Sequence, residues 1–355
     1  MKILLFSKYD RKGASSRVRT LQYISYLEKA GHSIVVYPLF TREYLESLYT
    51  SHTRPFPLVL KSYWNRFRKL QELRDFDAVW IEKELFPWLP FFEERILSKW
   101  KIPYIVDYDD SIFHKYDIHS NPMIRKFLGR KIDSVMNNAS VVITGNDYLA
   151  KKAISSGANR VEILPSSINL KNYPETQRQR NESFTIGWIG TPTTLPYLKM
   201  IEDPLMEFCQ GRDISLSIVG VKNFEVGNIR TECHEWSEEN EAELIDQFDA
   251  GIMPLPDEPW ERGKCGYKLI QYMGCFKPVI ASPVGVNNNI VVQGGNGFLA
   301  ENSKEWLEAF TYLYLQKDRA LEMGRAGRSL VEKHYCTDVI APKLEQIIGS
   351  LKRGF

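Results

Sequence analysis

The chain has 355 residues, of which 43% are hydrophobic and 25% are charged, and its formal net charge is +2. Two domains are expected, because this length exceeds what a single core of ordinary size accommodates. The composition excludes a disordered chain, and the small net charge argues against a dedicated nucleic-acid-binding protein. The five cysteines are scattered without CxxC spacing, which indicates neither a zinc site nor a disulfide framework.

Short apolar runs alternate with helical patterns along both halves of the chain. In the first half, the pattern predicts strands at residues 3–6, 34–37, 78–81, 104–106, 141–144 and 161–164. A helix is predicted over Arg19–Ala30, ending at Gly31. After a polar linker around residues 173–183, strands are predicted at 184–189, 216–219, 250–253 and 279–281. Alternating strands and helices imply parallel sheets with helices on both faces.

This alternation predicts an α/β protein with two Rossmann-like domains. The expected division is an N-terminal domain over residues 1–178, a second domain over 179–335, and a C-terminal helix over 336–355 that packs back toward the first domain. The carboxyl ends of both parallel sheets are expected to face an interdomain cleft, the natural ligand site of such folds. No apolar run approaches the roughly 20 residues that cross a bilayer.

A glycine-flanked basic turn precedes the helix predicted after Gly266. Gly263, Lys264, Gly266 and Lys268 surround its start, where unpaired N–H groups and the helix dipole favour an anion. Lysines are electrostatically disfavoured at a helix N-terminus, so an anionic ligand explains them better than solvent does. This turn therefore predicts a phosphate-bearing ligand in the C-terminal half.

The loop after the first strand carries a second candidate group, Gly13, Ser15, Ser16 and Arg17. Small residues let backbone N–H groups approach a ligand, and an arginine can hold a carboxylate or phosphate with two parallel bonds. The alternative is an ordinary helix cap made by one of the two serines.

Acidic residues follow the strand predicted at 104–106. Asp107, Asp109 and Asp110 are expected at the sheet edge, with His114 and His119 beyond them. Such carboxylates need solvent, a partner or a cation. The sequence leaves three interpretations open, which are contacts to acceptor hydroxyls, a metal site, and structural capping or ion pairing.

Several motifs occur in the order typical of one enzyme family. They are the Gly13–Arg19 loop, Pro165–Asn169, Ile186–Thr194, Leu216–Gly220, Gly251–Leu255, Gly263–Gly285 and Asn296–Ala300. The chain resembles the GT-B glycosyltransferases of family four, and within them a branch found in bacterial surface-polysaccharide pathways. The resemblance implies a retaining enzyme that uses a nucleotide-diphosphate sugar as donor, with no other cofactor and no metal.

The chain departs from the family pattern at three positions. Many members carry two glutamates eight positions apart, which contact the transferred sugar and the nucleotide ribose. Here Gly263 and Gln271 occupy those positions, and Glu261 is a candidate replacement for the first glutamate. The family's phosphate-binding arginine is also missing, because Gly190 is followed by Thr191, so the charge must come from Lys264 and Lys268.

The topology of the two sheets and the resemblance together predict two sets of site residues. The acceptor-side catalytic residues are Asp109, Asp110 and Arg17. The donor-binding residues are Gly13, Ser15, Ser16, Gly190, Thr191, Gly220, Glu261, Arg262, Lys264, Cys265, Gly266, Tyr267, Lys268 and Gln271. The acceptor is expected to be a glycan or a lipid-linked molecule. Two alternatives remain, a GT-B-fold sugar-nucleotide 2-epimerase and a catalytically weak nucleotide-sugar-binding partner subunit.

Residues Leu58–Arg74 are predicted to form an amphipathic helix. Leu60, Tyr63, Trp64, Phe67 and Leu70 would make its apolar face, flanked by lysines and arginines. One hypothesis is peripheral contact with an anionic membrane, and the other is ordinary packing on the domain core. The odd number and irregular spacing of the cysteines favour a reducing compartment, so the protein is expected to be cytoplasmic, at the inner face of the cytoplasmic membrane if the first hypothesis holds.

Overall fold

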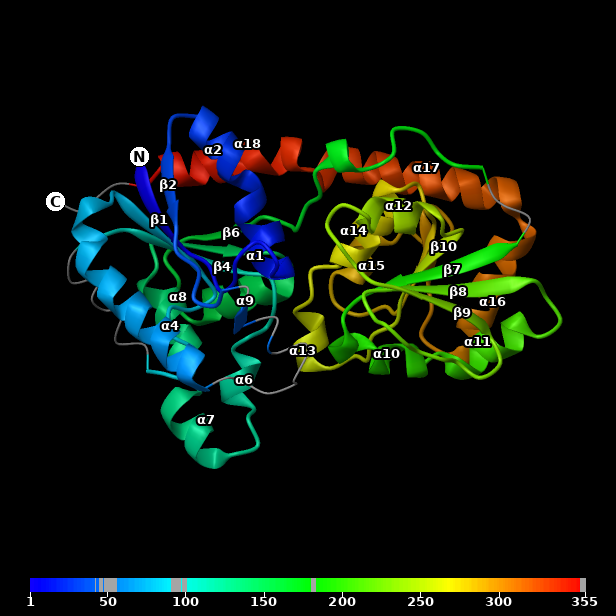
Figure 1. The fold of residues 1–355 in the computed structure, drawn as a ribbon, viewed down its shortest axis with the longest axis horizontal. Coiled ribbons are helices and arrows are strands. Elements are labelled where there is room, and N and C mark those ends of the chain that lie inside the picture. The colour runs from blue at the N-terminus through cyan, green and yellow to red at the C-terminus, as the bar shows by residue number, and fades with distance from the viewer. Residues whose placement is uncertain are drawn as a thin grey trace. The chain divides into compact units, whose positions relative to one another are not determined.

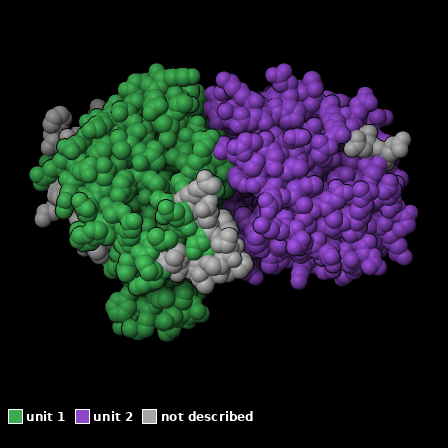
Figure 2. Space-filling view, viewed as in Figure 1, with its two compact units in different colours: residues 1–166, 340–355 green, residues 167–339 purple. Residues whose placement is uncertain are grey.

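The chain forms two compact units in the computed structural model, which describes residues 1–41, 43–44, 47, 56–90, 97, 101–179 and 183–351. Unit 1 comprises Met1–Ser166 together with Ile340–Phe355, and unit 2 comprises Ser167–Val339 (Figure 2). The structural division after Ser166 lies earlier in the chain than the division after residue 178 that the sequence predicted.

Unit 1 is built on a parallel sheet with the strand order β2-β1-β3-β4-β5-β6 (Figure 1). Its strands are β1 (Lys2–Phe6), β2 (Ser33–Val36), β3 (Ala78–Glu82), β4 (Tyr104–Tyr108), β5 (Val141–Thr144) and β6 (Val161–Ile163). The central strands are wholly buried, as continuous apolar runs in a parallel sheet require. The six strands predicted for this half are confirmed.

The helices of unit 1 lie on both sides of this sheet. They are α1 (Ala14–Arg19), α2 (Ile24–Lys29), α4 (Phe56–Lys69), α6 (His114–Asp117), α7 (Pro122–Leu128), α8 (Lys131–Asn138), α9 (Asp147–Ser155) and, from unit 2 into unit 1, α18 (Thr337–Gly349). The single helix predicted over Arg19–Ala30 is wrong, because a 3₁₀ turn at Leu21–Tyr23 separates α1 from α2. The predicted stop is confirmed at Gly31, whose φ is 89°.

Unit 2 repeats the parallel architecture with the strand order β12-β11-β10-β7-β8-β9. Its strands are β7 (Phe184–Ile189), β8 (Ile214–Val219), β9 (Arg230–His234), β10 (Ala250–Met253), β11 (Val279–Ala281) and β12 (Gly297–Leu299). Its helices are α10 (Pro196–Lys199), α11 (Glu202–Cys209), α12 (Glu241–Asp246), α13 (Pro259–Arg262), α14 (Tyr267–Gly274), α15 (Asn287–Ile290), α16 (Ser303–Leu315) and α17 (Lys317–His334). The sequence analysis did not predict the edge strands β9 and β12, and it predicted the other four strands of this unit.

In each unit, all strands run in the same direction, so their carboxyl ends meet at one edge of the sheet. The segments that follow β1, β3 and β4 therefore meet in unit 1, and those that follow β7 and β8 meet in unit 2. These are the edges at which open α/β sheets bind their ligands. That the two edges share one cleft stays a prediction.

Candidate functional site

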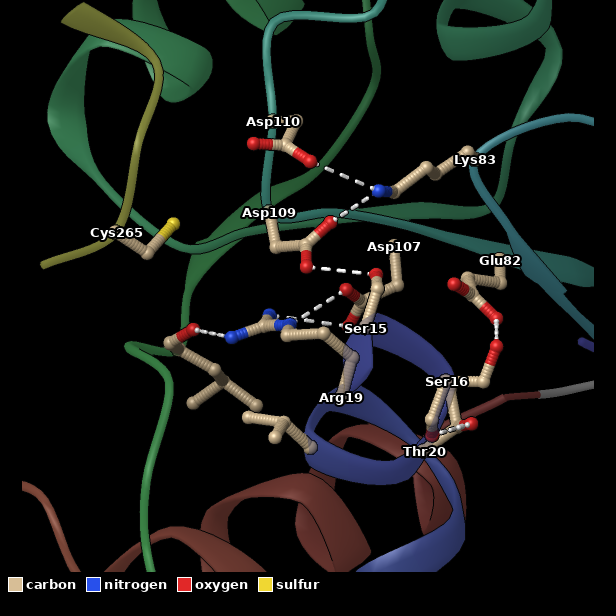
Figure 3. Close-up of polar contacts among 12 residues, drawn as sticks. Ser15, Ser16, Arg19, Thr20, Glu82, Lys83, Asp107, Asp109, Asp110 and Cys265 are labelled. Atoms are coloured by element: carbon tan, nitrogen blue, oxygen red, sulfur yellow. Dashed lines mark hydrogen bonds and ion pairs between the residues drawn. The ribbon is translucent and has the colours of Figure 1, made fainter. Parts of the chain in front are cut away.

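The two serines of the first loop connect α1 to the ends of neighbouring strands (Figure 3). Ser15 Oγ donates to Asp109 Oδ2 at 2.7 Å, and Ser16 Oγ donates to Glu82 Oε2 at 2.5 Å. Neither serine caps α1, whose N-cap is Gly13, so the capping alternative is wrong. Gly13 is required for close approach, because a Cβ there would lie 2.3 Å from the Tyr9 Cβ.

Lys83 joins the two aspartates that follow β4. Its Nζ lies 2.7 Å from Asp109 Oδ1 and 3.1 Å from Asp110 Oδ2 (Figure 3). Burial acts to lower the pKa of Lys83, but the two carboxylates outweigh it and hold that pKa well above its ordinary value. Burial acts to raise the pKa of Asp109, but the charges of Lys83 and Arg19, together with hydrogen bonds from Lys83 and Ser15, lower it to about 2. Sequence reasoning missed Lys83, although a lysine directly after a wholly buried strand was an available signal.

Asp107 does not lie at the exposed edge where the sequence placed it. Strand β4 continues to Tyr108, so Asp107 is inside the strand, 2% exposed. Its two carboxylate oxygens accept from Arg19 Nε at 2.8 Å and Arg19 Nη2 at 3.1 Å. Burial raises the pKa of Asp107 to about 6 against the opposing charge of Arg19, which leaves the carboxylate ionised at neutral pH. This bidentate pair joins α1 to the centre of the sheet.

The other groups near this edge have structural partners. Arg17 donates to the Arg11 carbonyl at 3.3 Å. His114 contacts Asp117 through Nδ1 and the Tyr148 hydroxyl through Nε2, both at 2.8 Å, and His119 Nδ1 accepts from the Asn121 amide. Within the described residues, no group of three or more His, Cys, Asp or Glu side chains could hold a metal ion.

Lys115 on α6 is a further basic group that sequence reasoning missed. Burial, and then the charges of Lys8 and Lys83, lower its pKa to about 7. The acceptor-side candidates thus include both paired carboxylates and a lysine that titrates near neutrality.

In unit 2, two glycines bring the ends of β7 and β8 together beside Lys268. A Cβ on Gly220, whose φ is 100°, would lie 2.0 Å from the Gly190 carbonyl oxygen. A Cβ on Gly190 would lie 2.3 Å from the Trp188 ring and 2.8 Å from Lys268 Nζ. Lys268 Nζ itself lies 4.0 Å from the centre of the Trp188 ring, a cation–π contact. The structure therefore brings together three residues that the sequence assigned to donor binding.

Helix α14 begins at Tyr267, directly after the basic turn. Gly266 is its N-cap, with φ at 64°, a left-handed conformation that favours glycine, and a Cβ there would also displace Ile290 Cδ1, 2.4 Å away. Cys265 is buried, with its Sγ 3.9 Å from the Gly263 carbonyl. The Lys264 amide donates to the Glu261 carbonyl at 3.0 Å, which closes the turn between α13 and α14.

The remaining donor-side candidates are spread around this turn. Glu261 is buried on α13 and accepts a short hydrogen bond from the Tyr197 hydroxyl. Arg262 forms an exposed two-bond pair with Asp257, at 2.6 and 2.9 Å. Gln271 is buried on α14, and Thr191 is exposed after β7, where it forms a capping box with Thr194.

Lys268 has the most informative electrostatics of the unit 2 group. Burial disfavours its ammonium form and, with a smaller contribution from the charge of Lys264, lowers its pKa to about 7. The charged form is costly here unless an anion accompanies it. The site is therefore electrostatically suited to an anionic ligand.

Comparison with known proteins shows which family and which fold the chain resembles. Residues 197–316, all within unit 2, match the model of the family glycosyl transferases group 1. A sucrose-phosphate synthase from Thermosynechococcus elongatus superposes with a TM-score of 0.71 at 15% identity, covering 98% of each chain. HepE from Anabaena, in complex with UDP-glucose, gives a TM-score of 0.71 at 15% identity, covering 99% of this chain and 100% of its own.

A third similar structure is a glycosyltransferase from Rickettsia africae, with a TM-score of 0.70 at 14% identity over 98% of this chain and 97% of the other. A search of curated proteins found no match. Residues 197–316 thus form a glycosyl transferases group 1 domain, and the whole chain has the GT-B fold that its motifs predicted. Within the described residues, no helix is long and apolar enough to cross a membrane.

Proposed function

We propose that this glycosyltransferase moves a sugar from a nucleotide-diphosphate sugar to a hydroxyl of a glycan or lipid-linked acceptor, in the biosynthesis of a surface polysaccharide or related glycoconjugate. The observation that carries the donor assignment is Lys268, stacked on Trp188 beside Gly190 and Gly220. A diphosphate restores the charged state of this lysine, and HepE, a protein of the same fold, was solved with UDP-glucose.

The proposed chemistry needs positive charge where the leaving group departs. Breaking the bond between sugar and diphosphate develops negative charge on the phosphate oxygen, and fixed cations stabilise that charge. Lys268, Lys264 and the N-terminal turn of α14 supply it without a metal. Gln271 is the proposed ribose contact. Glu261 can offer a sugar hydroxyl the carboxylate oxygen that does not accept from Tyr197.

The acceptor contacts are proposed in unit 1. Asp110 is the better candidate for an acceptor hydroxyl, because its side chain is 30% exposed whereas that of Asp109 is 14% exposed. Asp109 is instead a positioning residue, held by Ser15 and Lys83. We propose retention of the anomeric configuration, with the departing phosphate oxygen taking the proton of the attacking hydroxyl.

The test combines binding with turnover. Nucleotide-diphosphate sugars are screened by the shift in melting temperature, because a ligand that binds only the folded state stabilises it. The donor that binds best is then incubated with a panel of glycan and lipid-linked acceptors. Acceptor-dependent release of the nucleoside diphosphate that persists in EDTA is expected. Loss with EDTA and recovery with magnesium or manganese would contradict metal independence.

Two other outcomes would replace the proposal. Conversion of the donor to its 2-epimer without any acceptor would identify an epimerase. Tight donor binding without turnover across the whole panel would identify a nucleotide-sugar-binding partner subunit.

A further inference from the structure

Helix α4 exposes a row of large apolar side chains to solvent. Phe56, Leu60, Trp64 and Phe67 recur at helical spacing on one face, and Phe56 and Trp64 are 68% and 62% exposed. The rings of Trp64 and Phe67 stack, with their centres 6.2 Å apart. Exposed aromatic side chains gathered in this way mark an interaction surface rather than random exposure.

The neighbouring side of α4 attaches the helix to unit 1. The Tyr63 hydroxyl donates to the Pro87 carbonyl at 2.6 Å, and Leu70, just after the helix, is buried. Arg66 is fully buried and donates to the carbonyls of Ser7, Tyr37 and Leu85. The sequence had placed Tyr63 and Leu70 on the same face as Trp64. In the structure Leu70 is buried and Tyr63 is half-buried, so the predicted apolar stripe divides into a side that packs on unit 1 and a side that is exposed.

A second exposed apolar group lies around α7. Its members are Ile118, Met123 and Phe127, of which Phe127 is 68% exposed. A chain of contacts links this group to α4. Tyr63 bonds the Pro87 carbonyl, and the ring of the next residue, Trp88, packs edge-on against Tyr116 of α6. In Figure 1, α4 runs down one side of unit 1 toward its lower end, where α7 lies.

The charged residues within α4 and α7 are all basic. The sequence of α4, FPLVLKSYWNRFRK, contains four basic residues and no acidic residue, and Lys61 and Arg68 are exposed. The sequence of α7, PMIRKFL, adds Arg125 and Lys126 and is also free of acidic residues. Lys126 Nζ lies 5.8 Å from the centre of the Phe127 ring, so a cation accompanies the most exposed aromatic side chain.

We propose that the outward sides of α4 and α7 form a membrane-docking face that binds the surface of an anionic lipid bilayer. Aromatic and aliphatic side chains that enter the headgroup region, surrounded by lysine and arginine, are the chemistry of interfacial helices. The absence of acidic residues from both helices matches a surface that is uniformly negative. The inference goes beyond the proposed sugar transfer, and its test needs no nucleotide sugar.

The test is flotation of the full chain with lipid vesicles. Binding is expected to vesicles that contain phosphatidylglycerol, to weaken as salt concentration rises, and to be weaker on phosphatidylcholine alone. The double variant Trp64→Ser, Phe67→Ser and the single variant Phe127→Ser should each lower the vesicle–water partition coefficient about tenfold or more. Each variant removes apolar area that the bound protein would bury in the bilayer. Leu315→Ser, at an exposed position on α16 of unit 2, is the matched control and should bind like the unaltered protein.

The charge contribution has its own comparison. Lys61→Gln with Arg68→Gln should weaken binding to anionic vesicles but not to phosphatidylcholine, whereas Lys199→Gln, an exposed position on α10, should change neither. Circular dichroism and the melting temperature verify that every variant folds. Failure of the unaltered protein to bind anionic vesicles would overturn the proposal, as would equal binding by the double variant. Self-association that the double variant abolishes, without vesicle binding, would assign this face to a protein interface instead.

Discussion

Lys83 and Lys268 both lie near the carboxyl edge of a parallel sheet, and their surroundings shift their pKa values in opposite directions. Two carboxylates surround Lys83 and raise its pKa, so its charge is already balanced inside the protein. Lys268 has the Trp188 ring and the charge of Lys264 nearby, and its pKa falls to about 7. The first lysine is arranged to hold side chains in place. The second is arranged to receive an anion.

Replacing Lys268 by alanine should therefore weaken diphosphate binding selectively. The expected loss for a nucleoside diphosphate is about 1.5–3 kcal/mol, the range of a charge-assisted contact, with little loss for the nucleoside. Titration calorimetry with both ligands measures the difference, and Lys199→Ala in the same unit serves as the control. Equal diphosphate affinity of the variant and the unaltered protein would remove Lys268 from the site.

The lowered pKa of Lys268 also predicts the pH dependence of binding. The pKa is about 7 without ligand and should rise when a diphosphate binds, so the protein takes up a proton on binding at higher pH. Diphosphate affinity should fall as the pH rises above 7, because the ammonium must first be formed. Calorimetry at about pH 8, in buffers of different ionisation enthalpy, should detect uptake approaching about one proton.

Lys268→Arg is the matched variant for this effect, because a guanidinium stays charged over the whole range. It should keep diphosphate binding and lose the proton uptake. Persistence of the same uptake in Lys268→Arg would show that another group titrates.

Asp110 and Asp109 should differ in what their amide variants lose. Asp110→Asn should lower the rate of acceptor glycosylation about tenfold or more and leave donor binding within a few fold, because the proposed hydroxyl contact weakens. Asp109→Asn should lower the free energy of unfolding by about 1–3 kcal/mol, because it weakens the contacts with Lys83 and Ser15. Transfer assays and chemical denaturation measure the two effects. A fully active Asp110→Asn variant would exclude its assigned role.

At the residue scale, the sequence identified the acidic residues of the unit 1 site but not the side chains that pair with them. It grouped Asp107, Asp109 and Asp110 correctly near one strand, but it missed Lys83 and Arg19 as partners. Those partners lie far away in the chain, and only the strand order β1-β3-β4 brings them next to the aspartates. The burial of Asp107 was also not predicted, because the predicted strand ended at residue 106, whereas β4 extends to Tyr108 and includes Asp107.

At the scale of elements, the close approach of two loops shapes the donor edge. Gly190 and Gly220 follow adjacent strands, and the absence of side chains lets the Gly190 carbonyl lie beside the Gly220 Cα. The same absence leaves space for the Lys268 ammonium at the end of β7. The geometry of this edge thus depends on glycine at both positions.

Gly220→Ala and Gly211→Ala form a matched pair that isolates this contact. Both glycines have positive φ, 100° and 71°, but nothing lies within 4 Å of a Cβ added at Gly211. Gly211→Ala should cost about 1 kcal/mol of unfolding free energy from backbone strain. Gly220→Ala should cost about 1–3 kcal/mol more, because the Gly190 loop must move. It should also weaken diphosphate binding. Denaturation and calorimetry measure both effects, and equal costs in the two variants would contradict the argument.

The elements themselves were largely predictable because buried parallel strands are continuous apolar runs. Strand β12 was missed because its sequence GFL offers only two apolar residues after a glycine-rich segment, and β9 because its sequence RTECH is mostly polar at a sheet edge. The break between α1 and α2 was invisible for a different reason. Helical spacing continues across Leu21–Tyr23, and the long-range pairs of Arg19 and Ser16 belong to α1 alone.

At the scale of the whole molecule, the end of the chain belongs to the first unit. Helix α18 begins at the boundary of unit 2, and its residues from Ile340 onward pack into the core of unit 1. Ile340, Leu344, Ile347 and Ile348 are buried there in one cluster with strand residues such as Ile3 and Leu5. Unit 1 therefore depends on a segment synthesised after unit 2 is complete.

Ile348→Ala should destabilise unit 1 while leaving unit 2 intact. Ile348 is fully buried, so truncation should cost about 2–5 kcal/mol, whereas Ile154→Ala at a largely exposed position of α9 in the same unit should cost less than about 0.5 kcal/mol. Hydrogen exchange resolves the two units. Amides of β1, β3 and β4 should lose protection in Ile348→Ala, and those of β7, β8 and β10 should keep it. Equal loss of protection in both sheets would show that the units unfold as one cooperative body.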